Sequence, residues 1–258
     1  MHTSEPLVPA RLDLLGYGYT GSGYWTLATA QDKALTKALL KGYEIPTLRG
    51  RIYDQEDAGD WSIFPAIVKA SRQHASEAIT PQAVVTSAEE LRSRLKHVID
   101  IYQEPALVEE FVTGREFRVC ILNGHPPSIL PLVELDYSQL PDPLERLATY
   151  EAKFVPGSRH HEAIDVLCPA EVDPALEAHI QSVALRAYRA LRCQDYGRVD
   201  VRVRNGVPYV LDVNPNPDIT LETSFDYASE EAGMDYPALV DRIVQSALRR
   251  QPPDARIR

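Results

Sequence analysis

The sequence has few of the features that mark secreted, membrane-spanning or disulfide-stabilised proteins. Its 258 residues include three cysteines, and Cys120, Cys168 and Cys193 are scattered without a CxxC pair. This excludes a disulfide framework and fits a reducing compartment. The first residues lack the basic segment and long apolar core of a signal peptide. No uninterrupted apolar run approaches the ~18–20 residues that a membrane helix needs. These absences predict a cytoplasmic protein.

Positive charge is also scarce. The chain has 27 Lys and Arg against 37 Asp and Glu, which gives a formal net charge of −10 and a pI of about 5.2. This excess argues against nonspecific binding to nucleic acid or to an anionic membrane, although it is compatible with a local basic pocket. The composition is otherwise ordinary for a globular protein, with 44% hydrophobic and 25% charged residues. The length suits one large domain or two small ones.

The order of the predicted elements indicates an α+β fold with largely antiparallel sheets, because helices and strands do not alternate regularly. Residues 1–27 are rich in Pro, Gly and Tyr and are predicted to be irregular. The further predicted elements are a helix capped by Thr29 with Asp32 three residues on and ending at Gly42, a buried strand over 65–68 ending at Lys69, a helix from the Ser87 and Glu90 capping box to Tyr102, a strand over 106–112, a hairpin of Glu116–Leu122 with 128–135, a helix beginning at Asp173-Pro174, and two helices within 226–249 broken near Gly233.

The stretch YGRVDVRVRNGVPYVLDVNPNPD, residues 196–218, carries the strongest chemical signal. Arg198 and Asp200 share one face of its first strand, because side chains alternate along a strand. Asp212 and Asn214 share a face of the second. Two carboxylates and an amide oxygen suit Mg²⁺, which prefers oxygen ligands. The alternative is a solvated hairpin face with alternating charges. The two prolines of NPNP fix a rigid exit loop and favour the metal site.

The turn of this hairpin sets a condition on the metal site. A two-residue turn at Asn205-Gly206 would pair residue 204 with 207, and Asp200 and Asp212 would then point to opposite faces. The metal-site interpretation therefore predicts a turn of odd length centred near Gly206. This prediction runs against the preference of Asn-Gly hairpins for two-residue turns.

Several motifs together resemble one family. GRVDVRV and VLDVNPNPDIT resemble the C-terminal motif of ATP-grasp ligases, especially the D-alanine–D-alanine ligases. The similarity extends in consistent order through YTGS (19–22), DKALTK (32–37), IVKASRQHAS (67–76), LVEEFVTGREFRV (107–119) and YEAKF (150–154). The resemblance implies an ATP-grasp fold, with two α/β subdomains whose antiparallel sheets sandwich ATP. Residues 28–112 would form the central (lid) subdomain, 113–258 the C-terminal catalytic subdomain, and 1–27 a remnant or linker.

The resemblance also implies which residues bind the nucleotide. Lys37 and Lys69 would contact the phosphates of ATP, and Lys153 would reach them from the C-terminal subdomain. The hinge that binds adenine would consist of Glu109, Glu110, Phe111 and Val112. Glu116 would bind the ribose hydroxyls.

Metal and catalytic roles follow from the same resemblance. Asp200, Asp212 and Asn214 would hold two Mg²⁺ ions, with Mn²⁺ as an alternative. Arg198 would stabilise the acyl-phosphate and the tetrahedral species that follows it. Ser76 would lie in a loop that closes over the site and keeps water from the acyl-phosphate.

The implied activity is that of an ATP-dependent carboxylate–amine ligase, which forms an amide through an acyl-phosphate on an amino acid or dipeptide. Members of the family have a whole N-terminal domain before the YTGS-like segment. In this sequence only about 27 residues precede the first predicted helix. The alternative is therefore an ATP-binding half-enzyme or regulatory module. A homodimer, or a partner that supplies the missing domain, would complete the site. Asp218 stands where the dipeptide ligases have Gly and Phe154 where Tyr is usual, which bears on the identity of the substrate.

Two further motifs admit a functional interpretation. His160-His161 lacks the i, i+4 spacing or the cysteine partner of a metal site, and a loop is predicted instead. GYGYTG, Gly16 to Gly21, matches the GxGxxG pattern of dinucleotide-binding folds. No convincing strand precedes it and the next predicted helix starts several residues late, so a flexible glycine linker is the preferred interpretation.

Overall fold

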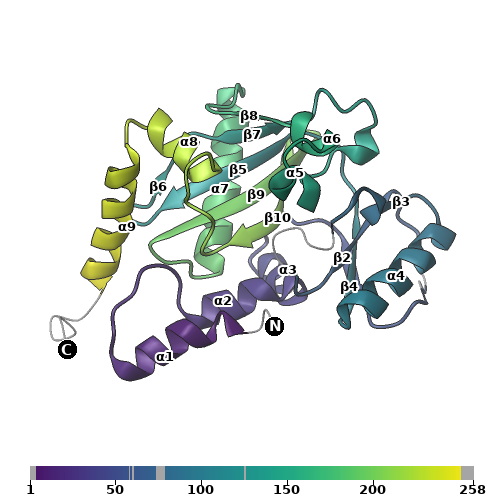
Figure 1. Ribbon diagram of the computed structural model, residues 1–258, viewed down its shortest axis with the longest axis horizontal. Coiled ribbons are helices and arrows are strands. Elements are labelled where there is room, and N and C mark those ends of the chain that lie inside the picture. Colours follow the sequence, from purple (N-terminus) through teal and green to yellow (C-terminus); the bar gives the residue numbers. More distant parts are fainter. Residues whose placement is uncertain (1–3, 58, 60, 74–78, 125, 251–258) are drawn as a thin grey trace.

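The computed structural model describes residues 4–57, 59, 61–73, 79–124 and 126–250 (Figure 1). The helices are α1 (Leu7–Leu15), α2 (Tyr24–Gln31), α3 (Lys33–Gly42), α4 (Ala88–Tyr102), α5 (Tyr150–Phe154), α6 (Arg159–Glu162), α7 (Pro174–Ala190), α8 (Ser224–Glu231) and α9 (Tyr236–Arg250). The strands are β1 (Gly50–Tyr53), β2 (Ala66–Ala70), β3 (Val84–Val85), β4 (Ala106–Glu110), β5 (Glu116–Leu122), β6 (Ser128–Ile129), β7 (Val133–Asp136), β8 (Asp165–Leu167), β9 (Tyr196–Arg204) and β10 (Val207–Asn214). Short 3-10 turns lie at Pro81–Ala83 and Pro143–Glu145.

The larger sheet is antiparallel and has the strand order β10-β9-β5-β7-β8, with β6 beside β5. Helix α7 packs on one face, where Phe117, Val119 and Ile121 of β5 join its buried core. Helices α8 and α9 pack on the other face, against Cys120 and Leu122. Because side chains alternate along β5, the charged residues of that strand lie on the side of α8.

The smaller sheet has the order β1-β4-β2-β3, and its described pairs are also antiparallel. Leu91, Leu95 and Val98 of α4 pack on it. Figure 1 shows this sheet and α4 at one end of the molecule and α9 at the other. The predicted cap of α4 is confirmed, since the Ser87 hydroxyl accepts a hydrogen bond from the Glu90 amide at 3.2 Å.

The N-terminal segment is more regular than predicted. Helix α1 and the first half of α2 lie within residues 1–27, which the sequence predicts to be irregular. Thr29 does not cap a helix but lies inside α2, and Asp32 caps α3 by accepting a hydrogen bond from the Leu35 amide at 3.0 Å. Pro6 precedes α1 and Pro9 lies in its first turn, where a missing amide proton costs little, so these prolines do not prevent the helix.

The later elements agree more closely with the sequence. Asp173 caps α7 with Pro174 at its first position, and the C-terminal helices separate at Gly233, whose φ is +77°. The predicted strand over 65–68 extends to Ala70, so Lys69 lies inside β2. The predicted strand over 128–135 divides into β6 and β7. Within the described part of the chain, no helix has both the length and the apolar content required to cross a membrane.

Candidate active site

The β9–β10 hairpin has a two-residue turn, so the predicted odd-length turn is wrong. Val207 pairs with Arg204, and Asn205 and Gly206 have φ values of +52° and +75°, as a type I′ turn requires. Asp212 nevertheless pairs directly with Asp200, because the register shifts between Val210 and Asp212. The odd residue lies in the strand as a β-bulge at Leu211.

The bulge brings the polar residues of the two strands together. Asp212 lies opposite Asp200 and Asn214 opposite Arg198, so the four side chains share one face. The Arg198 guanidinium donates to both carboxylate oxygens of Asp200, at 2.7 and 3.0 Å. The Asn214 amide donates to Asp200 at 3.2 Å. The convergence that the alternating pattern indicated is present, although by a different local geometry.

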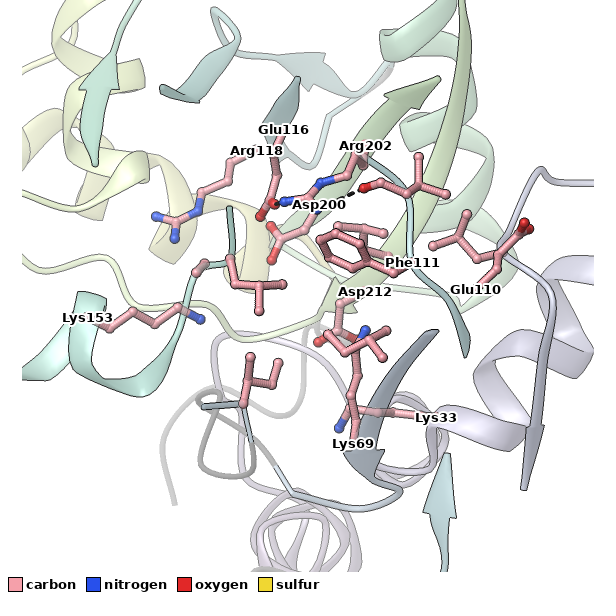
Figure 2. A pocket seen from close by; sticks show the side chains of 17 residues that line it. Lys33, Lys69, Glu110, Phe111, Glu116, Arg118, Lys153, Asp200, Arg202 and Asp212 are labelled. Atoms are coloured by element: carbon pink, nitrogen blue, oxygen red, sulfur yellow. Dashed lines mark hydrogen bonds and ion pairs between the residues drawn. The ribbon is translucent and has the colours of Figure 1, made fainter. Parts of the chain in front are cut away.

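A cavity with about 760 Å³ of empty space, partly open to solvent, lies between the two sheets (Figure 2). The Asp200 and Asp212 side chains reach it from the hairpin, and Lys69 reaches it from β2. Its wall is partly apolar, formed by Leu48, Ile67, Ile79, Phe111, Val112, Leu147, Ala148 and Leu211. The remaining lining residues are charged: Lys33, Lys69, Glu110, Glu116, Arg118, Lys153, Asp200, Arg202 and Asp212. A ligand with an apolar base and an anionic tail would match both halves.

Most of the residues singled out in the sequence reach this cavity. Those that line it are Lys69, Glu110, Phe111, Val112, Glu116, Lys153, Asp200 and Asp212. Arg198 and Asn214 do not line it but contact Asp200. Lys37 and Glu109 lie behind Lys69 and connect to the cavity through it. Ser76 lies outside the described residues.

Glu109 binds lysines through its side chain. Its carboxylate is 1% exposed and forms ion pairs with Lys69, at 2.8 Å, and with Lys37. Lys37 also donates to the Thr47 hydroxyl at 2.9 Å. Burial alone would raise the pKa of Glu109, but the ammonium groups of Lys69 and Lys37 outweigh it and lower this pKa to about 2. The carboxylate is therefore ionised and holds both lysines in place.

Glu116 is engaged by an arginine that the resemblance did not assign. Its Oε2 accepts hydrogen bonds from the Tyr137 hydroxyl, at 3.0 Å, and from Arg202. The Arg202 guanidinium lies 5.5 Å from the centre of the Phe111 ring and 5.6 Å from that of Tyr137. It also donates to the Val112 carbonyl at 3.0 Å. The hinge strand and the predicted ribose-binding carboxylate are thus joined by one guanidinium.

The charged end of the cavity shifts the ionisation of its own groups. Burial, Arg118 and Arg198 together lower the pKa of Lys153 to about 8. Burial opposes ionisation of Asp200, but the adjacent Arg198 guanidinium outweighs it and lowers the pKa of Asp200. Lys33 also has a lowered pKa, because of burial, with a further contribution from Lys69. Lys33 and Lys153 are therefore less firmly protonated here than in water.

Sequence reasoning assigned no role to three charged lining residues, Lys33, Arg118 and Arg202. Lys33 is the first helical residue after the Asp32 cap, and its ammonium group donates to the Gln73 carbonyl. The signal for the two arginines was present, since Arg118 follows Glu116 by two residues and Arg202 follows Asp200 by two. Residues two apart in a strand share a face.

The two other motifs do not form sites of their own. His160-His161 lies in the short helix α6, not in the predicted loop. The His160 ring contacts the Glu145 carbonyl at 3.2 Å and the His161 ring contacts the Ala152 carbonyl at 3.1 Å. Gly16 ends α1, so a helix and not a strand precedes the GxGxxG-like segment.

The donor set of the hairpin suits a hard divalent cation. Two carboxylates lie opposite each other on one face, and the amide of Asn214 adjoins them. Mg²⁺ takes one or two carboxylates from protein and completes its shell with water and phosphate oxygens. Among the described residues, no group of three or more His, Cys, Asp or Glu side chains could hold a metal ion. A site completed by a phosphorylated ligand is the arrangement that these residues fit.

The chain was compared with protein families, curated proteins and solved structures. Residues 48–245 match the family model described as D-ala D-ala ligase C-terminus. The chain is 31% identical over 245 residues to the uncharacterised protein y4sG of Sinorhizobium fredii, covering 94% of this chain and 70% of that protein. It is 32% identical over 249 residues to a D-alanine–D-alanine ligase of Desulforudis audaxviator, covering 94% and 77%.

The fold comparison agrees. A crystal structure of the D-alanine–D-alanine ligase of Bacillus anthracis complexed with ATP superimposes with a TM-score of 0.74 at 23% identity, covering 95% of this chain and 75% of that one. The predicted α+β, ATP-grasp fold is therefore confirmed. By family model, by sequence identity and by fold, the chain belongs to the D-alanine–D-alanine ligase family and matches its C-terminal, ATP-grasp part.

Proposed function

We propose that the chain is a cytoplasmic ATP-dependent ligase that joins the carboxylate of one small amino acid to the amine of another. One observation carries the proposal: the hairpin directs Asp200 and Asp212 into a cavity that is apolar at the hinge and cationic beyond it. Family membership supports the same activity, since the relative from Desulforudis audaxviator is named a D-alanine–D-alanine ligase. Residues 28–112 and 113–258 would form the two subdomains on either side of the nucleotide.

The nucleotide would lie along the cavity from the hinge to the hairpin. The adenine ring would pack between the apolar wall and backbone groups of Glu110 to Val112. The ribose would approach Glu116. Lys69 and Lys153 would contact the phosphates from opposite subdomains. Glu109 would hold Lys37 close to Lys69, where it adds positive charge for the phosphates. Protein cations that converge on a triphosphate position it and offset its charge.

Asp200, Asp212 and Asn214 would hold Mg²⁺, which neutralises and aligns a bound triphosphate. The substrate carboxylate would attack the γ-phosphorus, ADP would leave, and an acyl-phosphate would form. The amine of the second amino acid would then attack the acyl carbon and expel phosphate. The Arg198 guanidinium, fixed by Asp200, would stabilise the negative charge that develops on the acyl oxygen.

Phosphate release from ATP and Mg²⁺ tests this function. A panel of D- and L-amino acids is expected to include at least one that stimulates release. Asp212→Ala should abolish the stimulation, because it removes a carboxylate that the metal needs. Asp54→Ala is the matched control, since Asp54 is exposed and lies outside the cavity. ATP binding without stimulation by any amino acid would instead indicate an ATP-binding module without ligase turnover.

A further inference from the structure

Ser22, in the YTGS segment, does not line the cavity, but it contacts both ends of the hairpin that does. It is 1% exposed and lies two residues before α2. Its hydroxyl accepts a hydrogen bond from the Gln194 amide at 3.0 Å and donates one to the Pro215 carbonyl at 3.3 Å. Gln194 precedes β9, and Pro215 follows β10. One hydroxyl from a segment distant in sequence therefore joins the two strands at the open end of the hairpin.

This end of the hairpin is the one nearest the proposed metal ligands. Asn214 pairs with Arg198, and the residue that follows Asn214 is the one that the Ser22 hydroxyl holds. The Ser22 amide also donates to the side-chain oxygen of Asn216 at 3.0 Å. Asn214 in turn donates to Asp200 at 3.2 Å. The exit of the strand that carries Asn214 is thus fixed by two hydrogen bonds from Ser22.

The residue before Ser22 holds it in this position. The Gly21 amide donates to the buried Asp195 carboxylate at 2.8 Å, and Arg250 at the end of α9 donates to the same oxygen at 2.7 Å. Gly21 has a φ of +88°, and a β-carbon there would lie 2.5 Å from the side-chain oxygen of Asn216. The close approach and the positive φ both require glycine. The Gly-Ser pair is therefore fitted against the hairpin exit.

The hairpin needs this support because its pairing is irregular at the metal end. The bulge at Leu211 interrupts the ladder, and three residue pairs follow it, the last being Asn214 with Arg198. Pro215 comes next and has no amide proton to donate. Mg²⁺ demands nearly ideal octahedral geometry, so ligands from two strands must be held at a fixed separation. The Ser22 hydroxyl supplies a link between the strands where their own pairing ends.

We propose that Ser22 is a positioning residue of the metal site, and that its hydroxyl fixes the separation of β9 and β10 at Asp200 and Asn214. It acts through the backbone of the hairpin and does not itself contact the metal or the nucleotide. The inference rests on the proposed function, which requires a divalent cation at the hairpin. The glycine-containing segment that matches GxGxxG thereby receives a role unrelated to dinucleotide binding.

Binding of Mn²⁺ tests this inference without turnover. Electron paramagnetic resonance reports free Mn²⁺ while the ion is titrated into the protein, which is kept in excess over a non-hydrolysable ATP analogue. Ser22→Ala should weaken Mn²⁺ binding by about 10-fold, the lower end of the usual loss when an outer partner of a metal ligand is removed. Its affinity for the analogue without metal should change less than threefold.

Ser229→Ala is the matched control for the loss of a buried hydroxyl. Ser229 is 0% exposed, and its hydroxyl donates to the Asp226 carbonyl within α8 at 3.0 Å. Its removal should lower the melting temperature much as Ser22→Ala does, because each variant loses one buried hydrogen bond. Mn²⁺ binding by Ser229→Ala should nevertheless stay within threefold of that of the wild type.

Gly21→Ala provides a second variant, because its methyl group would displace Asn216 while the Ser22 hydroxyl is retained. It should weaken Mn²⁺ binding at least as much as Ser22→Ala. Gly16→Ala is its control, since Gly16 also has a positive φ, +72°, but a β-carbon there meets no atom within 4 Å.

Unchanged Mn²⁺ affinity in either Ser22→Ala or Gly21→Ala would overturn the inference. Equal losses in Ser22→Ala and Ser229→Ala would also overturn it, as would a wild type that binds no Mn²⁺. Mn²⁺ binding as expected, without phosphate release stimulated by any amino acid, would leave Ser22 assigned and defeat the ligase function alone.

Discussion

The smaller and the larger sheet both supply charges to the cavity, but they hold them in different ways. In the smaller sheet, one buried carboxylate, Glu109, is shared by Lys37 and Lys69. In the larger sheet each ion pair joins one cation to one anion. In the smaller sheet two lysines therefore share the negative charge of Glu109. In the larger sheet the ion pairs are one to one, and among the described residues Arg118 forms no ion pair.

The difference indicates what each sheet contributes. Two ammonium groups around one carboxylate carry an excess positive charge that a triphosphate can satisfy without breaking the cluster. One-to-one pairs such as Arg198–Asp200 have fixed geometry, because two parallel hydrogen bonds define the plane of both groups. The smaller sheet would supply adaptable charge for the nucleotide, and the larger sheet would supply oriented groups for the chemistry.

The largest effect is expected from breaking the shared carboxylate. Glu109→Gln leaves Lys37 and Lys69 buried beside each other, which should lower the free energy of unfolding by about 3–5 kcal/mol. Urea unfolding at neutral pH measures this. ATP should raise the melting temperature of the variant more than that of the wild type, because the triphosphate replaces the lost charge. Glu162→Gln, at an exposed position, is the control.

The same carboxylate gives a pH dependence with a definite sign. Its pKa is about 2 in the folded protein and ordinarily 4.5, so its contribution to stability is complete above about 4.5. It should disappear as the pH falls from there toward 2. A difference between wild type and Glu109→Gln that stayed constant across this window would contradict the buried triad.

A fixed pair of the larger sheet should matter for rate. Arg198→Gln removes the donor proposed to stabilise the developing acyl oxygen and should lower amino-acid-stimulated phosphate release by about 10²–10³-fold, the usual effect of losing one such donor. Steady-state kinetics with ATP and Mg²⁺ measure it. Arg92→Gln, at an exposed position of α4, serves as the control, and a loss below threefold would remove Arg198 from the proposed mechanism.

Lys153 should make nucleotide use pH-dependent. Its pKa is about 8, so its positive charge is present below pH 8 and is lost above it. The kcat/KM for ATP should therefore fall about tenfold per pH unit above 8. Lys153→Arg should remove this inflection because arginine stays protonated. Titration of Lys153 does not itself destabilise the fold in this range, since a lysine whose pKa is lowered by folding adds stability as the pH rises from 8 to 10.5.

The smallest effect is expected at Asp218. Its carboxylate accepts hydrogen bonds from the amide and the hydroxyl of Thr220, at 2.9 and 2.7 Å, and is thus turned into its own loop. Asp218→Gly should change the KM of the amino acid by less than threefold and the stability by about 0.5–1 kcal/mol. A larger change in KM would mean that this side chain enters the substrate pocket.

The sequence predicted the faces of the hairpin better than its turn. Alternation placed Asp200 and Arg198 together, because period-2 patterning depends on local geometry alone. The bulge was missed although its trace is visible, since Val210 and Leu211 are consecutive apolar residues that interrupt the alternation. Asn205-Gly206 favours a two-residue turn, which by itself would point Asp200 and Asp212 to opposite faces. The extra residue of the bulge, Leu211, restores the two carboxylates to one face.

The partners of charged residues were beyond sequence reasoning. Glu109 meets Lys37 and Lys69 across three separate elements, and no local pattern encodes such contacts. The N-terminal helices were missed for a related reason. Helix α1 leaves Leu7 and Leu14 exposed and shows no strong amphipathic pattern, so sequence periodicity could not reveal it.

The bulge has one consequence for the shape of the binding surface. A regular strand presents neighbours on one face about 7 Å apart along its axis. At the bulge, Leu211 and Asp212 are consecutive in the chain and both line the cavity. The apolar part and the charged part of the cavity wall therefore meet at a single peptide bond of β10, the one between Leu211 and Asp212. A nucleotide bound across this peptide bond would place its base on the apolar side and its phosphates on the charged side, so the single strand β10 would contact both parts of the nucleotide.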